Sequence, residues 1–258
     1  GHYQRIWVLV RGSYKRNDGS WTVVPWGKDQ SKSLVGYWVD SDPKMIIPDP
    51  IMRGAQTGAL CIVRVVGDTR IGGSGGFLMS DAAATLETVG GVTLTNGVGH
   101  LLHGRGEIRG VLDNEGEVRS DYAAGTSLAL VMENKSNTGT MSAANDANLD
   151  IDAIILDNRG GRLLADGGGV RLLGGAQIIG GGFETTGSSE IRAQNATLTD
   201  IVNLGVLRVA DSTTTVVTGQ ELRNDGRILI GLANTALAIL RFDAQVELTG
   251  PGRLELLN

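Results

Sequence analysis

The chain has 258 residues, with 39 Gly, 5 Pro, one Cys and 4% aromatic residues, and its length suits one large domain or two small ones. A single cysteine excludes an intramolecular disulfide and a cysteine-based zinc site, and a formal net charge of −5 argues against a nucleic-acid partner, which needs a basic surface. The apolar runs are far shorter than the roughly 20 residues of a membrane-spanning helix, and the abundant glycine lacks the G-X-Y period of collagen.

Residues 1–66 differ in composition from the rest of the chain. They hold all four Trp, four of the five Pro and no Glu, and they carry nine Lys or Arg against five Asp, whereas residues 67–258 carry 14 basic against 23 acidic groups. We therefore expect a boundary near Val66 and Gly67, between an N-terminal β segment or cap (1–66) and a second region (67–258). Within the first region, Asn17-Asp18-Gly19 lies between two strand-like runs and predicts a β-hairpin.

Four aromatic side chains of the first region are candidate ligand-binding residues. Exposed, they would stack on sugar rings and mark a glycan-binding face. Buried, they would form the core of a small β unit or a plug over the end of the second region. These residues are Trp21, Trp26, Tyr37 and Trp38.

A short phrase, Asn-x-Gly-x-apolar, recurs through the second region. Successive Asn residues are 23, 21, 45 and 21 residues apart, and we interpret the 45 as two steps, with residues 179–183 at the intervening corner. Such a period indicates stacked structural units. Glycine allows a positive φ and Asn can bond from one unit to the next, so each phrase is expected to form a corner. The expected corner residues are Asn114, Gly116, Asn137, Gly139, Asn158, Gly160, Asn203, Gly205, Asn224 and Gly226.

Short runs of alternating apolar and polar residues lie between these corners, for example at 127–131, 149–153 and 190–193. Period-two alternation is typical of strands with one buried face, and glycine interrupts nearly every window that could hold a helical pattern. Three strands of about five residues plus corners fill one unit of about 22 residues. The sequence therefore predicts an all-β fold, a parallel β-helix of about eight or nine turns over residues 67–258.

The repeats resemble the β-helical repeats of large bacterial secreted and surface proteins, of which filamentous haemagglutinin-like adhesins and autotransporter passengers are examples. The resemblance covers about residues 70–258 and leaves the first 66 unmatched. It implies an exported, right-handed parallel β-helix that serves as a stalk or adhesive surface, outside the cell or on its surface. The matching patterns are Leu94-Thr-Asn-Gly97, Gly104-x-Gly-x-Ile108-x-Gly110, Asn114-x-Gly-x-Val118 and Asn137-x-Gly-x-Met141.

Paired carboxylates are the candidate catalytic groups, because many β-helices cut polysaccharides. Asp150 and Asp152 flank one apolar residue, so on a strand they would share an outer face about 7 Å apart, within the range of inverting glycosidases. Asp157 is a weaker third member. A solvent-facing strand produces such pairs by default, so a structural role is the simpler interpretation. No spacing predicts a metal site, and His100 and His103 are expected on the surface.

The leading hypothesis is a non-catalytic structural or adhesive module with no cofactor, and with a glycan or a host- or cell-surface component as its partner. The alternative is a polysaccharide-degrading β-helix, such as a lyase, a glycosidase or a phage tailspike fragment, and a third hypothesis is glycan binding without turnover. Gly1-His2 is typical of a cleaved tag and residues 250–258 of a repeat in progress. We therefore expect a piece of a longer exported protein.

Overall fold

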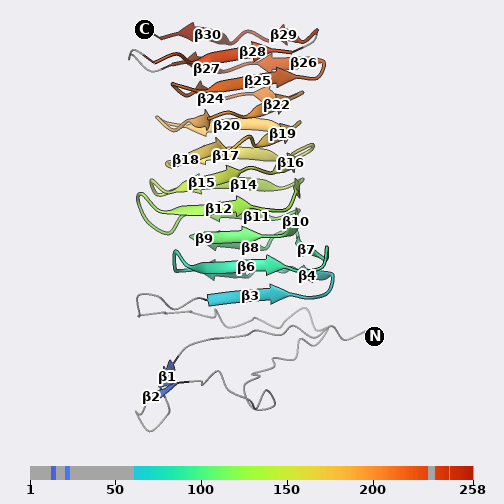
Figure 1. The fold of residues 1–258 in the computed structure, drawn as a ribbon, viewed down its shortest axis with the longest axis vertical. Helices are drawn as coiled ribbons and strands as arrows, with labels where there is room; N and C mark the ends of the chain where they lie inside the picture. The colour runs from blue at the N-terminus through green and yellow to red at the C-terminus, as the bar shows by residue number, and fades with distance from the viewer. Residues whose placement is uncertain (1–12, 16–20, 24–60, 232–235, 244, 258) are drawn as a thin grey trace.

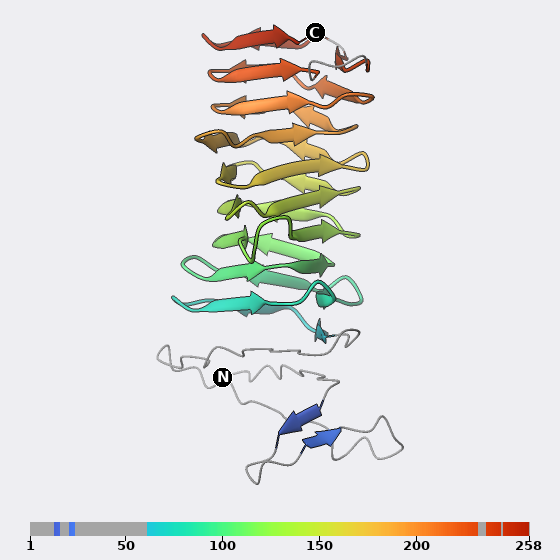
Figure 2. The ribbon, with the colours of Figure 1, turned by 90° about the vertical axis from the view of Figure 1, so that its left-hand side faces the viewer.

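The computed structural model describes residues 13–15, 21–23, 61–231, 236–243 and 245–257. Within these ranges the regular structure is entirely β, and from β3 onward the chain winds through three strands per turn, with successive turns stacked along one axis (Figures 1 and 2). Each strand from β3 to β27 pairs in parallel with the strand three places further along the chain. The predicted parallel β-helix is therefore confirmed.

Three parallel sheets form the walls of this solenoid, and each turn visits them in the order I, II, III. Sheet I contains β4 (Thr69–Ile71), β7 (Thr93–Asn96), β10 (Val111–Asn114), β13 (Lys135–Asn137), β16 (Ile155–Asp157), β19 (Gln177–Ile179), β22 (Thr197–Thr199), β25 (Thr214–Thr218) and β28 (Ile239–Phe242). Sheet II contains β5 (Gly76–Met79), β8 (Leu101–Gly104), β11 (Glu117–Ser120), β14 (Thr140–Ala144), β17 (Arg162–Asp166), β20 (Gly182–Thr186), β23 (Val202–Asn203), β26 (Glu221–Asn224) and β29 (Glu247–Thr249). Sheet III contains β3 (Cys61–Val65), β6 (Ala84–Thr88), β9 (Gly106–Arg109), β12 (Ser127–Val131), β15 (Asn148–Asp152), β18 (Gly169–Leu173), β21 (Ile191–Ala193), β24 (Val206–Val209), β27 (Arg227–Ile230) and β30 (Arg253–Leu256).

Two features of the chain order refine the sequence-based expectation. The strand β3 pairs with β6, so sheet III already includes Cys61, which precedes the expected boundary. Turn length also varies about the period of 22: Ile191 pairs with Leu207, 16 residues on, whereas Ile228 pairs with Leu254, 26 residues on. Before the solenoid, β1 (Ser13–Lys15) pairs antiparallel with β2 (Trp21–Val23), which confirms the predicted hairpin pairing.

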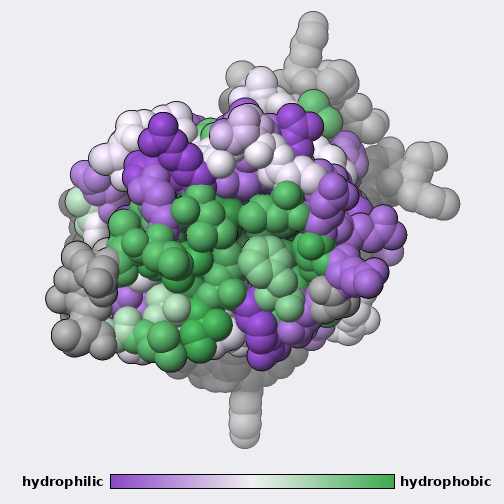
Figure 3. Space-filling model, turned by 90° about the horizontal axis from the view of Figure 1, so that it is seen from above, coloured by the Kyte–Doolittle hydropathy of each residue, from purple (hydrophilic) through white to green (hydrophobic). Residues whose placement is uncertain are grey.

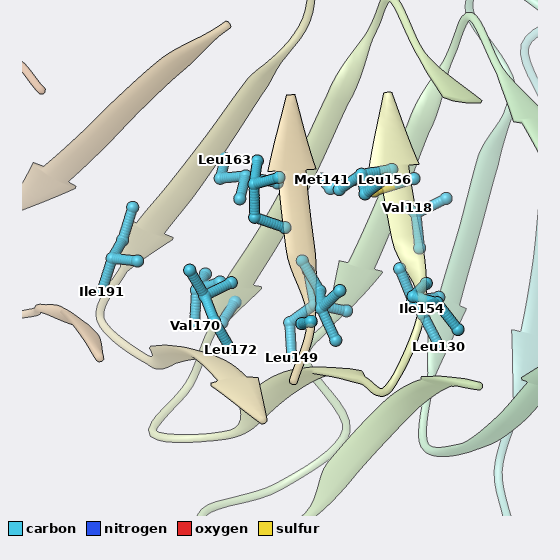
Figure 4. Close-up of a cluster of buried hydrophobic side chains, with 14 of the residues drawn as sticks. Val118, Leu130, Met141, Leu149, Ile154, Leu156, Leu163, Val170, Leu172 and Ile191 are labelled. Carbon is cyan, nitrogen blue, oxygen red and sulfur yellow. The ribbon is translucent and has the colours of Figure 1, made fainter. Parts of the chain in front are cut away.

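The core is a column of inward-facing apolar side chains that runs through the stacked turns (Figure 4). Strand after strand shows the alternation of buried and partly exposed residues, as in β12, where Leu128 and Leu130 are fully buried. A fully buried Leu contributes about 1.5–3 kcal/mol relative to an exposed one. Because each turn covers the apolar face of the next, stability comes from the contacts between neighbouring turns.

Asparagine side chains form a buried ladder at the corner between sheets I and II. Asn96 donates to Asn114, Asn114 to Asn137 and Asn137 to Asn158, through Nδ2···Oδ1 distances of 2.7, 2.7 and 2.6 Å. The ladder ends where Gly180 occupies the next position and accepts from Asn158 through its carbonyl at 3.4 Å. The predicted bonding from turn to turn is present at this first asparagine ladder.

The Asn-Gly phrase then moves to a different corner, so the five phrases do not all stack along one edge of the solenoid. Asn203 and Asn224 end strands of sheet II and bond to each other at 2.7 Å, forming a second asparagine ladder at the corner with sheet III. Asn203 is in register with Phe183 of the preceding turn, an apolar side chain. The separation of 45 residues therefore spans two turns but joins two different corners.

The corner glycines are required mainly by close approach of the turns, and the expected positive φ is wrong for most of them. Among the predicted corner glycines, a positive φ of 81° occurs at Gly160. At Gly116, Gly139 and Gly226 a Cβ atom would instead lie 2.1–2.4 Å from a carbonyl oxygen of the turn below. At Gly205 it would lie 2.6 Å from the amide nitrogen of Thr185. Only glycine lets the backbones approach this closely.

Candidate functional site

The outer face of sheet III brings the first two candidate carboxylates together on β15, but Asp150 is already engaged. Its two oxygens accept from Nε and Nη2 of Arg171, one turn further on, at 2.6 Å each. Asp150 is 8% exposed, and Arg171 also donates to Ser127 at 3.0 Å. The hydrogen bonds that Arg171 donates to Asp150 raise the pKa of Arg171, and burial opposes the change. The result is a bidentate pair that links three successive strands.

The other two candidate carboxylates are arranged differently. Asp152 follows on the same strand, in register with Leu173, and its Oδ1 lies 2.1 Å from the position that a Cβ on Gly174 would take. Asp157 belongs to sheet I and accepts from Arg159 Nε at 2.8 Å. That hydrogen bond lowers the pKa of Asp157. The structure therefore brings Asp150 and Asp152 onto one strand and leaves Asp157 on another wall.

Arginines continue the Asp150–Arg171 pair along sheet III. Arg192 is in register with Arg171 and Arg208 with Arg192, so three guanidinium groups follow one another over three turns. Glu190 accepts from Arg192 Nε at 3.1 Å and from Arg208 Nε at 2.6 Å. Burial raises the pKa of Glu190, but the two arginine hydrogen bonds outweigh it, so the pKa lies below its usual value.

A shallow hollow of about 290 Å³ opens beside Glu190 at the corner between sheets II and III. Its lining is polar or glycine, and Asp146 there has a φ of +56°. The lining residues are Asp146, Gly167, Gly168, Gly169, Ser188, Ser189 and Glu190. Sequence reasoning missed this hollow because its residues come from three different turns.

A second polar cluster, also missed from the sequence, lies on sheet II. His103 Nδ1 is 3.1 Å from both oxygens of Asp121, and Arg119 Nε is 3.3 Å from Asp121 Oδ2 and 3.5 Å from Glu117 Oε1. Ser142 donates to Glu117 at 3.1 Å. The alternation Glu117-x-Arg119-x-Asp121 is the signal that could have indicated it, because alternate residues of a strand share a face.

The two histidines are less exposed than expected. His100 is 7% exposed, and its Nδ1 lies 2.7 Å from Asn96 Oδ1 at the start of the first asparagine ladder. Burial, with the nearby charge of His103 as a smaller cause, lowers the pKa of His100. The expectation of a surface position is therefore wrong for His100, which acts as a donor to the ladder.

One lysine occupies a core position. Lys135 is 3% exposed and lies in register between Leu112 and Leu156. Its Nζ donates to the carbonyl oxygens of Gly110, Val131 and Glu133, at 3.0, 3.0 and 2.9 Å. Burial lowers the pKa of Lys135 to about 8, and the charge of Glu133 opposes the decrease. The ammonium group therefore stabilises the corner between sheets III and I through these three hydrogen bonds.

The remaining candidates cannot be assembled into a site. Trp26, Tyr37 and Trp38 lie outside the described residues, and Trp21 is described only as part of the strand β2. No group of three or more His, Cys, Asp or Glu side chains in the described part of the chain is arranged to hold a metal ion. The same residues include no helix with the length and apolar character needed to cross a membrane.

Comparison of this chain with protein-family models, with curated proteins and with solved structures gives no match. The fold, a parallel β-solenoid, therefore stands on the strand pairing described above.

Proposed function

We propose that this chain is a non-catalytic structural or adhesive β-helical module of an exported bacterial surface or secreted protein. The observation that carries the proposal is that the charged groups of the outer faces bind one another. Carboxylates and arginines pair from turn to turn, as in Arg64–Glu87, Arg162–Glu184 and Arg227–Glu255. Each exposed ion pair contributes only about 0–1 kcal/mol to stability. Because such pairs recur from turn to turn along the stacked core, they are consistent with a rod-like structural module.

The state of Asp150 supports a structural role over glycoside hydrolysis. A general acid needs a proton, and a general base or nucleophile needs a lone pair directed at the substrate. Both Asp150 oxygens instead accept from Arg171. Asp152, the other candidate on this strand, therefore has no free second carboxylate beside it with which to catalyse glycoside hydrolysis.

Glycan binding is the second candidate function, and the polar hollow beside Glu190 favours it. Hydroxyl and carboxylate groups at Ser188, Ser189 and Asp146 are the side chains that could bond to sugar hydroxyls there. Most small-molecule sites are more enclosed and more apolar than this hollow, so we rank it below the structural role.

Two experiments test the ranking. The first applies antibodies raised against the purified chain to intact cells, permeabilised cells and culture medium of the source bacterium. We expect signal on intact cells or in the medium, and signal confined to permeabilised cells would contradict export. The second assays depolymerisation of acidic and neutral glycans by the wild type and by Asp150→Asn with Asp152→Asn. Activity that the double substitution abolishes would reverse the ranking in favour of an enzyme.

A glycan array separates adhesion through sugars from a purely structural role. Variants with Trp21→Ala, Trp38→Ala or Ser189→Ala are compared with the wild type. Binding lost on Trp21→Ala or Trp38→Ala would assign it to the N-terminal segment, whereas binding lost on Ser189→Ala would assign it to the hollow.

A further inference from the structure

The connections from sheet II to sheet III form one edge of the solenoid, to which every turn contributes a short segment. Strands of neighbouring turns lie about 4.8 Å apart, so the row of connections from β8 to β20 spans about 19 Å over four turns. The residues of this row that concern us, which we call the II/III edge, are Arg105, Tyr122, Asp146, Gly167, Ser188 and Ser189.

An exposed aromatic ring lies at one end of the II/III edge. Tyr122 is 43% exposed, and the guanidinium carbon of Arg105 lies 4.3 Å from the centroid of its ring. Arg105 Nε in turn donates to the carbonyl oxygen of Ser80 at 3.0 Å, so the cation over the ring is itself held in place. The remaining exposed surface of the tyrosine ring is therefore positioned to stack on the apolar face of a sugar.

Further along the edge, Asp146 carries a carboxylate without a partner. Asp150 and Glu190 nearby accept hydrogen bonds from arginines. Within the part of the chain that the structure describes, no group donates to the Asp146 carboxylate, which is exposed and lines the hollow of about 290 Å³. Ser189 Oγ accepts from the amide of Gly167 at 2.9 Å, and its hydroxyl hydrogen has no acceptor among the same residues. These two side chains are free to bond to sugar hydroxyls.

Hydrogen bonds join the two parts of the edge into one scaffold. The amide of Gly125, which lies in the same connection as the exposed ring, donates to the carbonyl oxygen of Asp146 at 2.9 Å. The amide of Asp146 donates to the carbonyl oxygen of Gly167 at 2.5 Å, and Asn145 Nδ2 donates to that of Asp121 at 3.0 Å. The ring and the carboxylate are therefore held in place before a ligand arrives, which reduces the entropy lost on binding.

We propose that the II/III edge binds a neutral, linear oligosaccharide that lies along the axis of the solenoid. Tyr122 stacks on one sugar ring, and Asp146 and Ser189 bond to hydroxyl groups of sugars further along the oligosaccharide. The inference rests on glycan binding, the second candidate function above, and adds to it the class of glycan and the direction in which it lies.

The composition of the edge favours a neutral glycan over other ligands. An unpaired carboxylate repels the charged groups of an acidic glycan and the phosphates of a nucleic acid. Seen from the C-terminal end, hydrophobic residues gather at the centre of the solenoid and hydrophilic residues lie around much of its rim, which disfavours a lipid on the outside (Figure 3). A row of about 19 Å also accommodates several sugar residues, so many contacts add to those of the shallow hollow.

Isothermal titration calorimetry with the full chain tests the proposal. The probes are linear oligosaccharides of glucan, mannan, xylan and galactan in series of increasing length, with oligogalacturonate as the acidic comparison. We expect the affinity for a neutral series to rise with length until the edge is filled. Tyr122→Ala and Asp146→Asn are each expected to raise the Kd at least about tenfold, whereas Tyr122→Phe, which keeps the ring, is expected to retain the wild-type affinity.

The variants are chosen to keep the fold. Asp146 has a φ of +56°, a conformation that Asn also tolerates, so Asp146→Asn removes the charge without straining the corner. Val98→Ala and Glu247→Gln are the matched controls and should bind as the wild type does. Val98 is 73% exposed between sheets I and II, and Glu247 is exposed on β29, so both lie outside the edge. Unfolding midpoints verify that every variant is folded.

Each outcome decides the proposal. It is overturned by failure of every neutral series to bind at about 1 mM, by binding confined to oligogalacturonate, or by an affinity that does not change with length. Equal affinity of the wild type, Tyr122→Ala and Asp146→Asn would also overturn it, as would binding that is lost on Trp21→Ala or Trp38→Ala instead.

The antibody experiment described above separates this inference from the proposed function. An exported chain that binds none of the oligosaccharides would leave the structural module in place and remove the II/III edge as a glycan site. Binding that depends on Tyr122 and Asp146, in a chain confined to the cell interior, would contradict export and retain the site.

Discussion

The buried lysine makes a prediction about how stability changes with pH. Lys135 has a pKa near 8 in the folded chain, whereas its ordinary value is 10.5. Between these values the unfolded chain binds more protons at this position than the folded chain. By linkage, the free energy of unfolding therefore rises with pH across this window. The contribution is complete above the unfolded pKa and is lost as the pH falls through the folded pKa.

The size of the effect follows from the difference between the two pKa values. One pKa unit corresponds to about 1.36 kcal/mol, so the full effect is about 3 kcal/mol, of which about half is recovered by pH 9. Lys135→Met removes the titrating group. It also leaves the carbonyl oxygens of Gly110, Val131 and Glu133 without this donor, which lowers stability at every pH. The informative quantity is therefore the slope against pH.

Urea unfolding followed by far-ultraviolet circular dichroism, from about pH 7 to pH 10, measures this slope. We expect the wild type to gain stability relative to Lys135→Met as the pH rises. Leu156→Met, at the next register position, is the control and should keep the wild-type slope. A constant difference between wild type and Lys135→Met at all pH values would refute the assignment of Lys135 as a buried, titrating core residue.

Three further substitutions test the corners and the core by their unfolding midpoints. Gly139→Ala places a Cβ 2.1 Å from the carbonyl oxygen of Gly116 and should lower the free energy of unfolding by about 2 kcal/mol or more. Gly75→Ala is the control, because a Cβ there has no heavy atom of the described residues within 4 Å. Equal stability of the two variants would contradict the close-approach explanation. Asn137→Ala removes three side-chain hydrogen bonds from the first ladder and should cost about 2–4 kcal/mol, and a loss below about 0.5 kcal/mol would show that the ladder contributes little. Thr215→Val should stabilise by about 1 kcal/mol, because the fully buried Thr215 hydroxyl has no hydrogen-bond partner in the part of the chain that the structure describes; destabilisation would reveal a partner for it.

The fold was predictable because its determinants are local in sequence. Alternation of apolar and polar residues indicates a strand with one buried face, and the Asn-x-Gly phrase indicates a tight corner. Neither signal says which of three corners a phrase occupies. The phrase at Asn158 follows sheet I and the phrase at Asn203 follows sheet II, although both look alike in the sequence.

The candidate sites were much harder to predict because their contacts cross turns. Arg171 lies 21 residues after Asp150, and Arg208 lies 18 residues after Glu190. Turn lengths range at least from 16 to 26 residues, so partners across turns cannot be counted from a fixed period. Lys135 shows the same limit, since a polar residue that takes an inward position in register with Leu112 cannot be recognised from alternation alone.

The two ladders explain why the corner phrase can change place. In each ladder Nδ2 donates toward the C-terminal end, so the first amide needs a donor for its oxygen and the last needs an acceptor. His100 supplies the donor for Asn96 in the first ladder. Phe183 precedes Asn203 in register, and among the described residues the buried Asn203 Oδ1 has no hydrogen-bond partner.

That missing bond is the local cost of starting a second ladder, on the order of 1–3 kcal/mol for an unsatisfied buried acceptor. The side-chain nitrogen Nδ2 of Asn203 offsets part of this cost by donating to Asn224 Oδ1 at 2.7 Å and to the carbonyl oxygen of Arg227 at 3.1 Å. A Cβ added to Gly226 would lie 2.1 Å from the carbonyl oxygen of Gly205, the same distance as between a Cβ added to Gly139 and the carbonyl oxygen of Gly116. The phrase therefore forms the same corner after either sheet, which is why it identifies a bend without identifying the wall that the bend follows.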